Sequence, residues 1–278
     1  MPASAPPVAL IVLTRQSPEA LDLSLASLYN QTFREFEVLV ADTTRLDRYD
    51  PVVALHAEHL DQPLRHIHAP GDPLNQARAL NAAVASTQSE YLVFMGGDCI
   101  AQPGFIEAHV DAAEYGYFAC GESLPLDPQL SGRVSAETIG SGQLFDEGWL
   151  TSASPGWVKQ HLRTSPVGML RDWLRRDTPG QQYWNCDASS CFRDDAMKIN
   201  GFDMDVEDWR QDRDFANRLQ NNGMEPVRPA VAGNVMQLYR HPMPDLQPTG
   251  GRLPVKLAPA GEVRASHGVE ELLSAVQG

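Results

Sequence analysis

The chain has 278 residues, of which 42% are hydrophobic, and a formal net charge of −14 at pH 7. This length and composition allow one α/β domain with a sizeable core and an appended subdomain. The acidic balance argues against a nucleic-acid partner, which would need a basic surface, so any anionic ligand must be met by local Arg residues, a metal ion or helix N-termini.

No run of about 18 apolar residues predicts a transmembrane helix, which leaves only peripheral contact with a membrane open. Residues 1–7 lack the basic region and the long apolar segment of a secretory signal. The four cysteines (Cys99, Cys120, Cys186 and Cys191) form no C-x-x-C pair. We therefore expect a cytoplasmic protein with reduced thiols and no zinc site.

The first third of the chain alternates between short apolar runs and helical patterns. Strands are predicted at 8–13, 36–41, 64–68 and 91–95, and helices at 17–28, 51–60 and 74–84. Ser17 followed by Pro18 is typical of a helix N-cap and first helical residue. The β-α-β-α-β-α-β order predicts a parallel sheet with right-handed crossovers and a ligand crevice at the carboxyl ends of its strands.

Polar residues follow three of these predicted strands. Thr14 and Arg15 follow the first, Asp42 follows the second, and Asp98 comes directly after a Gly-Gly break. Each alone is compatible with ordinary turn chemistry, but together they indicate a binding site at one edge of the sheet. The sequence contains no G-x-G-x-x-G, P-loop or G-x-S-x-G motif, which disfavours a dinucleotide-binding protein, a P-loop enzyme and an α/β hydrolase.

The middle of the chain is less regular. A helix is expected from residue 103 and a strand at 116–120. Residues 121–184 are rich in Gly, Pro, Ser and Trp, and only one short helix, at 169–176, is predicted there. Such a stretch is either a functional loop region or an ordinary surface insertion whose tryptophans fill small cores.

A later helix is expected to begin near 211–214 and to end at Gly223. Asp212 or Asp214 would then lie in its first turn, where an acid is either a site residue or a helix cap. A last strand is predicted at 231–238. Beyond residue 243 we expect a loosely attached tail with a short helix at 269–276.

Taken together, these motifs resemble the family 2 glycosyltransferases from Val8 to about Pro242. The resemblance is carried by the segments 11–32, 36–44, 77–83, 94–103 and 200–219. Gly96-Gly97-Asp98 stands where the family has a DxD motif, so Gly96 replaces the first Asp of that motif. Gln211 replaces the Glu of a Glu-Asp pair. Near the last strand, where a metal-ligating His is often found, Gln237 and His241 occupy the two candidate places.

The resemblance implies an α/β protein of the GT-A fold, a single Rossmann-like, mostly parallel sheet flanked by helices with an acceptor-side subdomain. Residues 1–120 would be the nucleotide-sugar-binding half, 121–242 the acceptor-binding and catalytic half of the same domain, and 243–278 a C-terminal tail. The implied activity is that of an inverting, hexosyltransferase-type enzyme. It would move a sugar from a nucleoside-diphosphate sugar to a hydroxyl of a glycan, polysaccharide or glycoconjugate.

The resemblance also implies residue roles. Asp212 would be the catalytic base, with Asp214 as the alternative. Mg²⁺ or Mn²⁺ would be the cofactor, with Asp98 and His241 as ligands; because Gly96 replaces the first Asp, Asp98 would hold the ion alone or hold none. The substrate-binding residues would be Thr14, Arg15, Asp42, Arg78, Gly97, Asp98, Trp184 and Asp214.

Three alternatives remain open at this point. Arg78 is either a diphosphate ligand or a solvated helix arginine. The changes at Gly96 and Gln211 are also compatible with a nucleotide-sugar-binding protein that has lost catalysis. A nucleotidylyltransferase on a related fold is disfavoured, because the residues after the first strand include neither a Gly-rich loop nor a Lys.

Overall fold

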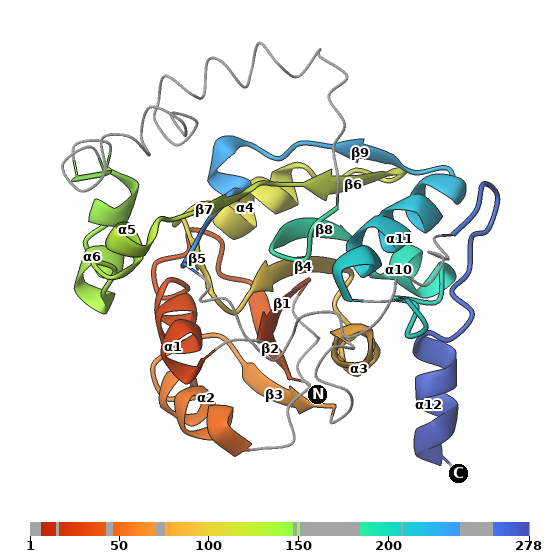
Figure 1. Ribbon diagram of the computed structural model, residues 1–278, viewed down its shortest axis with the longest axis horizontal. Helices are drawn as coiled ribbons and strands as arrows, with labels where there is room; N and C mark the ends of the chain where they lie inside the picture. Colours follow the sequence, from red (N-terminus) through yellow and green to blue (C-terminus); the bar gives the residue numbers. More distant parts are fainter. Residues whose placement is uncertain are drawn as a thin grey trace.

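The computed structural model describes residues 7–14, 17–42, 47–69, 76–146, 149–150, 184–206, 208–239 and 258–277. Within these residues the chain forms a seven-stranded sheet of order β3-β2-β1-β4-β8-β6-β9 beside a three-stranded sheet of order β5-β10-β7 (Figure 1). The strands of the larger sheet are β1 (Val8–Thr14), β2 (Phe36–Asp42), β3 (Leu64–His68), β4 (Tyr91–Gly96), β6 (Tyr117–Cys120), β8 (Ala188–Phe192) and β9 (Glu225–Val227). The smaller sheet consists of β5 (Cys99–Ala101), β7 (Ser123–Pro125) and β10 (Val235–Gln237).

The four strands β3, β2, β1 and β4 run parallel to one another, as the alternating pattern predicted. β8 breaks the pattern because it pairs antiparallel with both β4 and β6, whereas β9 is parallel to β6. An antiparallel strand places its amino end beside the carboxyl ends of its neighbours. The residues just before β8 therefore reach the same edge of the sheet as the residues that follow β1, β2 and β4.

The helices are α1 (Pro18–Ala26), α2 (Asp50–Ala57), α3 (Gln76–Ser86), α4 (Phe105–Asp111), α5 (Pro128–Ser131), α6 (Ala136–Gly140), α10 (Arg193–Lys198), α11 (Asp208–Asn221) and α12 (Val269–Gln277). Short 3₁₀ turns lie at η1 (Asp47–Tyr49), η2 (Gln143–Phe145) and η4 (Val231–Gly233). The predicted start of α1 is confirmed, because the Ser17 hydroxyl accepts a hydrogen bond from the Ala20 N–H and Pro18 is the first helical residue. None of the described helices is long and apolar enough to cross a membrane.

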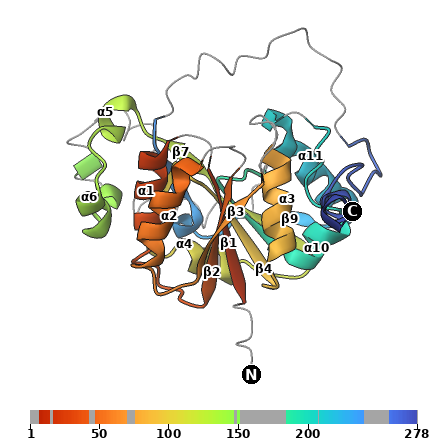
Figure 2. The same cartoon turned by 90° about the horizontal axis from the view of Figure 1, so that it is seen from below.

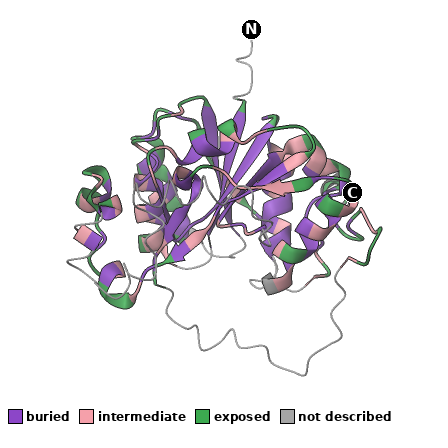
Figure 3. Cartoon of the chain, turned by 90° about the horizontal axis from the view of Figure 1, so that it is seen from above, coloured by how far each residue is buried: buried purple, intermediate pink, exposed green. Residues whose placement is uncertain are grey.

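The helices cover both faces of the larger sheet (Figure 2). α1, α2 and α4 pack on one face, against Leu10, Val12 and neighbouring strand residues. α3, α10, α11 and α12 pack on the other face, against Ile11, Leu13 and their neighbours. The strands β1, β2 and β4 are therefore buried on both sides (Figure 3), which is why they are largely apolar runs in the sequence.

Residues 121–146 contain more regular secondary structure than the sequence predicted. α5 and α6 form here, and each begins at a side-chain cap, Asp127 for α5 and Ser135 for α6. Their apolar residues join the smaller sheet in a third hydrophobic cluster that includes Leu126, Leu130 and Ile139. The predicted helix at 169–176 lies outside the described residues.

Three further expectations near the C-terminus need correction. α11 begins at Asp208, earlier than predicted, so Asp212 and Asp214 lie beyond its first residues. The last strand is only the three-residue β10, preceded by the 3₁₀ turn η4.

The described part of the tail, 258–277, is not loosely attached. The Asn200 side chain donates to the Ala265 carbonyl and to Glu271, and accepts from the Glu270 N–H. The predicted helix at its end is confirmed as α12, whose Val269 is fully buried.

Candidate active site

The carboxyl ends of β1, β2 and β4 meet at one edge of the larger sheet. Thr14 and Asp42 are direct partners across β1 and β2. Gly97, which follows β4, donates its N–H to the Leu13 carbonyl at 2.8 Å. A Cβ at Gly97 would lie 3.0 Å from the Thr14 Cα, so only glycine lets the two segments approach this closely. The structure thus brings together Thr14, Asp42 and Gly97, whereas Arg15 lies outside the described residues.

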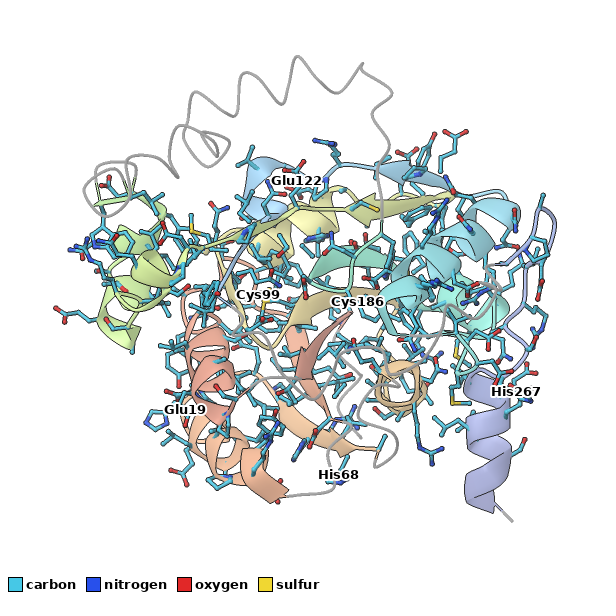
Figure 4. The ribbon with its side chains drawn as sticks, in the orientation of Figure 1. Glu19, His68, Cys99, Glu122, Cys186 and His267 are labelled. Carbon is cyan, nitrogen blue, oxygen red and sulfur yellow. The ribbon has the colours of Figure 1, made fainter. Side chains whose placement is uncertain are left out.

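Two histidines of β3, His66 and His68, lie beside Asp42, and neither was predicted as a candidate site residue from the sequence. Asp42 is fully buried. Its Oδ2 lies 3.4 Å from His66 Nε2 and 3.9 Å from His68 Nδ1, and His66 Nδ1 lies 2.6 Å from Asp50 Oδ1. The neighbouring Asp42 carboxylate, more than Asp50, raises the pKa of His66 despite its partial burial. The available signal was the His-x-His spacing on a predicted strand, which puts both rings on one face; Figure 4 shows His68 at the end of β3.

A second cluster surrounds Asp98. Asp98 is 4% exposed, and the Cys99 thiol donates to its Oδ1 across 3.9 Å. Asp187, directly before β8, completes the group: the ligand atoms of Asp98, Cys99 and Asp187 lie within 4.8 Å of one another. Two carboxylates this close suit a hard divalent cation such as Mg²⁺ or Mn²⁺. Asp187 was not among the predicted residues, because its approach to Asp98 depends on the pairing of two strands distant in sequence.

Gln237 lies beside this cluster, at the end of β10. Its Nε2 donates to Asp187 Oδ2 at 2.9 Å and lies 3.9 Å from Cys99 Sγ. The side chain therefore holds the Asp187 carboxylate in place through an N–H donor. His241, the other residue predicted near this place, lies outside the described residues.

Asp212 contacts the backbone of Cys186, the residue before Asp187. It lies on α11, and its Oδ1 accepts a hydrogen bond from the Cys186 N–H at 3.2 Å. Cys186 is followed directly by Asp187. The predicted base is thus hydrogen-bonded to the residue that precedes Asp187 of the carboxylate cluster.

Asp214 has a different environment. It is buried, and its Oδ2 lies 2.8 Å from both Nε and Nη2 of Arg218. Its Oδ1 accepts from the Ala258 N–H at 2.8 Å, while Arg218 Nη1 donates to the carbonyls of Ile199 and Gly201. Both carboxylate oxygens are therefore engaged in holding α11, the turn after α10 and residue 258 together.

Trp184 lies in the hydrophobic core, which corrects its predicted role in substrate binding. The residue is 2% exposed, and its ring centroid lies 5.2 Å from that of Phe94 and 4.6 Å from that of Phe215. Its indole N–H points to Cys186 Sγ at 3.4 Å. A large aromatic side chain gains more from this aromatic packing than from a place at the surface, and no face of the ring is left for a sugar.

Arg78 lies in the first turn of α3 and is partly buried. Its Nε is buried and has no hydrogen-bond partner among the described residues. An unsatisfied buried donor on a charged group is costly, so an anionic ligand beside Arg78 would be stabilised. This observation favours the predicted role in diphosphate binding over that of a solvated helix arginine.

Residues 9–127 match the family model described as glycosyl transferase family 2. A comparison with curated protein sequences gives no match.

Several solved structures are similar to this chain. The mannosyltransferase PcManGT from Pyrobaculum calidifontis, in complex with GDP-Man and Mn²⁺, is 17% identical with a TM-score of 0.56, over 85% of this chain and 58% of that chain. S. aureus TarS 1–349 is 13% identical with a TM-score of 0.52, over 83% and 60%. Its complex with UDP is 15% identical with a TM-score of 0.50, over 80% and 57%. The chain spans less than two thirds of each of these proteins, and likeness at these identities establishes the fold alone.

Proposed function

We propose that this protein, a chain of the GT-A fold whose residues 9–127 match the model of glycosyl transferase family 2, transfers a sugar from a nucleoside-diphosphate sugar to an acceptor hydroxyl. The transfer would be of the hexosyl type and would invert the anomeric carbon. The acceptor would be a glycan, polysaccharide or glycoconjugate.

One observation carries this proposal. Asp98 and Asp187 converge at the carboxyl edge of the sheet, and the residue before Asp187 donates its N–H to Asp212. A carboxylate pair suited to a diphosphate-bound cation is thus linked, through the hydrogen bond of the Cys186 N–H, to a carboxylate suited to proton abstraction. Glycosyl transfer needs both groups, since negative charge leaves with the diphosphate while a proton leaves the acceptor.

Asp212 is the proposed base, and Asp214 is the poorer choice. The Cys186 N–H fixes the Asp212 carboxylate, which is how a base is held ready to take a proton from a bound hydroxyl. Both oxygens of Asp214 are instead bound to Arg218 and Ala258. Proton abstraction by Asp214 would require breaking a buried ion pair.

The nucleotide would lie along the edge formed by β1, β2 and β3. Asp42, with His66 and His68 beside it, would contact the base. Thr14, Arg15 and Gly97 would border the sugar and phosphates, and Arg78 would contact the diphosphate. The similar structures that contain GDP-Man or UDP support a nucleoside diphosphate as the ligand class.

The residues of the Asp98 cluster fit the divalent cation that the family implies. Gly96 has no Cβ, and the space that a Cβ would fill is occupied by the Asp187 carboxylate, so two oxygen donors are available. A bound Mg²⁺ or Mn²⁺ would offset the negative charge of the diphosphate. His241 remains a proposed further ligand.

We also propose a separate role for each of three segments of the chain. Residues 1–120 would bind the nucleotide sugar, 121–242 would bind the acceptor and carry the base, and 243–278 would follow as a C-terminal segment. All four cysteines are buried thiols, which supports a reducing compartment such as the cytoplasm.

The alternative function is nucleotide-sugar binding without catalysis. Gly96 and Gln211 favour it, because each replaces an acid expected from the family. Gln211 donates to the Val206 carbonyl at 3.1 Å, which is a structural contact. This alternative predicts ligand binding with no transfer to any acceptor and no hydrolysis of the donor.

The experiment that tests the proposal is a thermal-shift panel of nucleoside diphosphates and their sugars, each with and without Mn²⁺. Nucleoside monophosphates of the same bases serve as matched controls that lack the second phosphate. We expect one diphosphate series to raise the melting temperature more than its monophosphate does. If no diphosphate or diphosphate sugar stabilises the protein, the proposed function is wrong. A stabilising sugar that is neither transferred nor hydrolysed would support the non-catalytic alternative.

A further inference from the structure

Gly96, the last residue of β4, lies beside the carboxylate of Asp187, the residue directly before β8. A Cβ built on Gly96 would clash with Asp187 Oδ1, and would also lie 2.9 Å from Cys99 Sγ and 3.0 Å from Asp98 Oδ1. Any side chain at residue 96 would therefore compete with Asp187 for the same space. Glycine is the residue that leaves this space open to a carboxylate arriving from elsewhere.

The pairing of β4 with β8 brings Asp187 to this position. Met95 lies opposite Ala188 in the antiparallel ladder, so the next residues outward, Gly96 and Asp187, are neighbours across the two strands. Gln237 then fixes Asp187, because its Nε2 donates to Oδ2 while Oδ1 is the oxygen beside Gly96. Three elements, β4, β8 and β10, thus determine where the Asp187 carboxylate lies.

The resulting pair of carboxylates would be stabilised by a bound cation. Asp98 and Asp187 have oxygens within 4.8 Å of each other in a site where Asp98 is almost fully buried. Two like charges at this distance repel, and a divalent ion between them converts the repulsion into attraction. Carboxylate oxygens favour hard cations such as Mg²⁺ and Mn²⁺, while the Cys99 thiol contacts Asp98 as a hydrogen-bond donor.

We propose that Asp187 replaces the acid missing at residue 96, so that Asp98 and Asp187 together hold a divalent cation from opposite strands. Gln237 acts as a positioning residue for Asp187. The role of the ion, to bind a diphosphate, rests on the proposed function; its binding to this pair does not. Residue 96 and residue 187 are then interchangeable as the source of the second carboxylate.

The test is a Mn²⁺ titration of the purified full chain without any nucleotide, in which free Mn²⁺ is measured by its paramagnetic resonance signal. We expect Asp187→Asn, which keeps the side-chain shape, and Asp98→Asn each to weaken Mn²⁺ binding by at least about tenfold. Asp111→Asn, a change of the same charge at an exposed acid at the end of α4, should leave the affinity unchanged.

An exchange variant makes the test specific. Gly96→Asp together with Asp187→Ala moves the carboxylate to residue 96 and removes the clashing oxygen. We expect this double variant to bind Mn²⁺ at least about tenfold more tightly than Asp187→Ala alone. Gly96→Asp alone should lower the melting temperature, because the new side chain collides with Asp187.

The outcomes separate this inference from the proposed function. An unchanged Mn²⁺ affinity in Asp187→Asn, or an exchange variant that binds no better than Asp187→Ala, overturns the inference even if nucleoside diphosphates bind. Loss of Mn²⁺ affinity on Asp187→Asn and its recovery in the exchange variant uphold the inference even if no nucleotide sugar binds.

Discussion

The backbone N–H of Cys186 donates a hydrogen bond to Oδ1 of Asp212 across 3.2 Å, and this bond ties α11 to the turn that carries Asp187. The proposed base therefore lies on a helix whose position is coupled to the carboxylate cluster. A small displacement of the turn before β8 would move both groups at once.

We expect Asp212→Asn to retain nucleoside diphosphate binding and to lower the rate of transfer by about 10²–10⁴-fold, the usual contribution of a general base. The Asn side chain can still accept the Cys186 N–H through its oxygen, so the local structure is preserved. Affinity is measured by calorimetry and transfer by product formation with the donor identified from the panel. Transfer at the wild-type rate in this variant would refute the assignment of Asp212.

Asp214→Asn should act on stability instead. The change leaves the Arg218 guanidinium buried without its counter-charge, which costs about 3–5 kcal/mol when one partner of a buried pair is removed. Denaturant unfolding measures the loss as a lower midpoint. Asp212→Asn is the matched control two residues away on the same helix and should change the midpoint little. Equal midpoints for the two variants would contradict the structural role of Asp214.

Arg78→Ala should weaken binding of nucleoside diphosphates by about tenfold or more, the equivalent of one charge-assisted hydrogen bond of about 1.5–3 kcal/mol. Binding of the free nucleoside should be unchanged, since the guanidinium would contact only phosphate. Arg34→Ala removes the same charge from a side chain that is 51% exposed and serves as the control. Equal losses for diphosphate and nucleoside would show that Arg78 only supports the fold.

A buried histidine makes stability depend on pH. His109 Nε2 donates to the Gly233 carbonyl, and its Nδ1 accepts from the Ser190 hydroxyl, which in turn accepts from Tyr91. Burial lowers the pKa of His109 to about 4. The unfolded chain takes up a proton near pH 6.5 while the folded chain does not, so stability is complete above pH 6.5 and falls as the pH drops towards 4.

The loss over this window should reach about 3 kcal/mol, as the two pKa values imply. Carboxylates also titrate there, so the measurement is the difference between wild type and His109→Gln in free energies of unfolding from pH 7 to pH 4. We expect the wild type to lose more stability than the variant. Parallel curves would show that His109 contributes nothing to the dependence.

The elements within residues 1–120 were predicted well from the sequence because their signals are local. The apolar runs of β1, β2 and β4 are buried on both faces and so appear as uninterrupted hydrophobic stretches, and Ser17-Pro18 marks the start of α1 unambiguously. Thr14, Asp42 and Asp98 could be predicted to lie at one edge because residues that follow parallel strands must meet there.

The short strands and part of the candidate site could not be predicted, because they depend on contacts between residues that are distant in sequence. β5, β7 and β10 are three residues each, too short to show periodicity. Asp187 was missed because only the register between β4 and β8 brings it to Asp98. Trp184 was misplaced because nothing local distinguishes a tryptophan that packs on Phe94 from one that is exposed to ligand.

The position of β8 in the sheet bears on how the chain could be divided. β6 lies within residues 1–120, yet its two partners, β8 and β9, both lie beyond them. A fragment ending at residue 120 would leave β6 unpaired and would expose the apolar edge of β4 that β8 normally covers. Open edges of this kind template aggregation. The two halves of the domain are therefore interleaved strand by strand, and neither can be produced as an independently folding unit by cutting the chain between them.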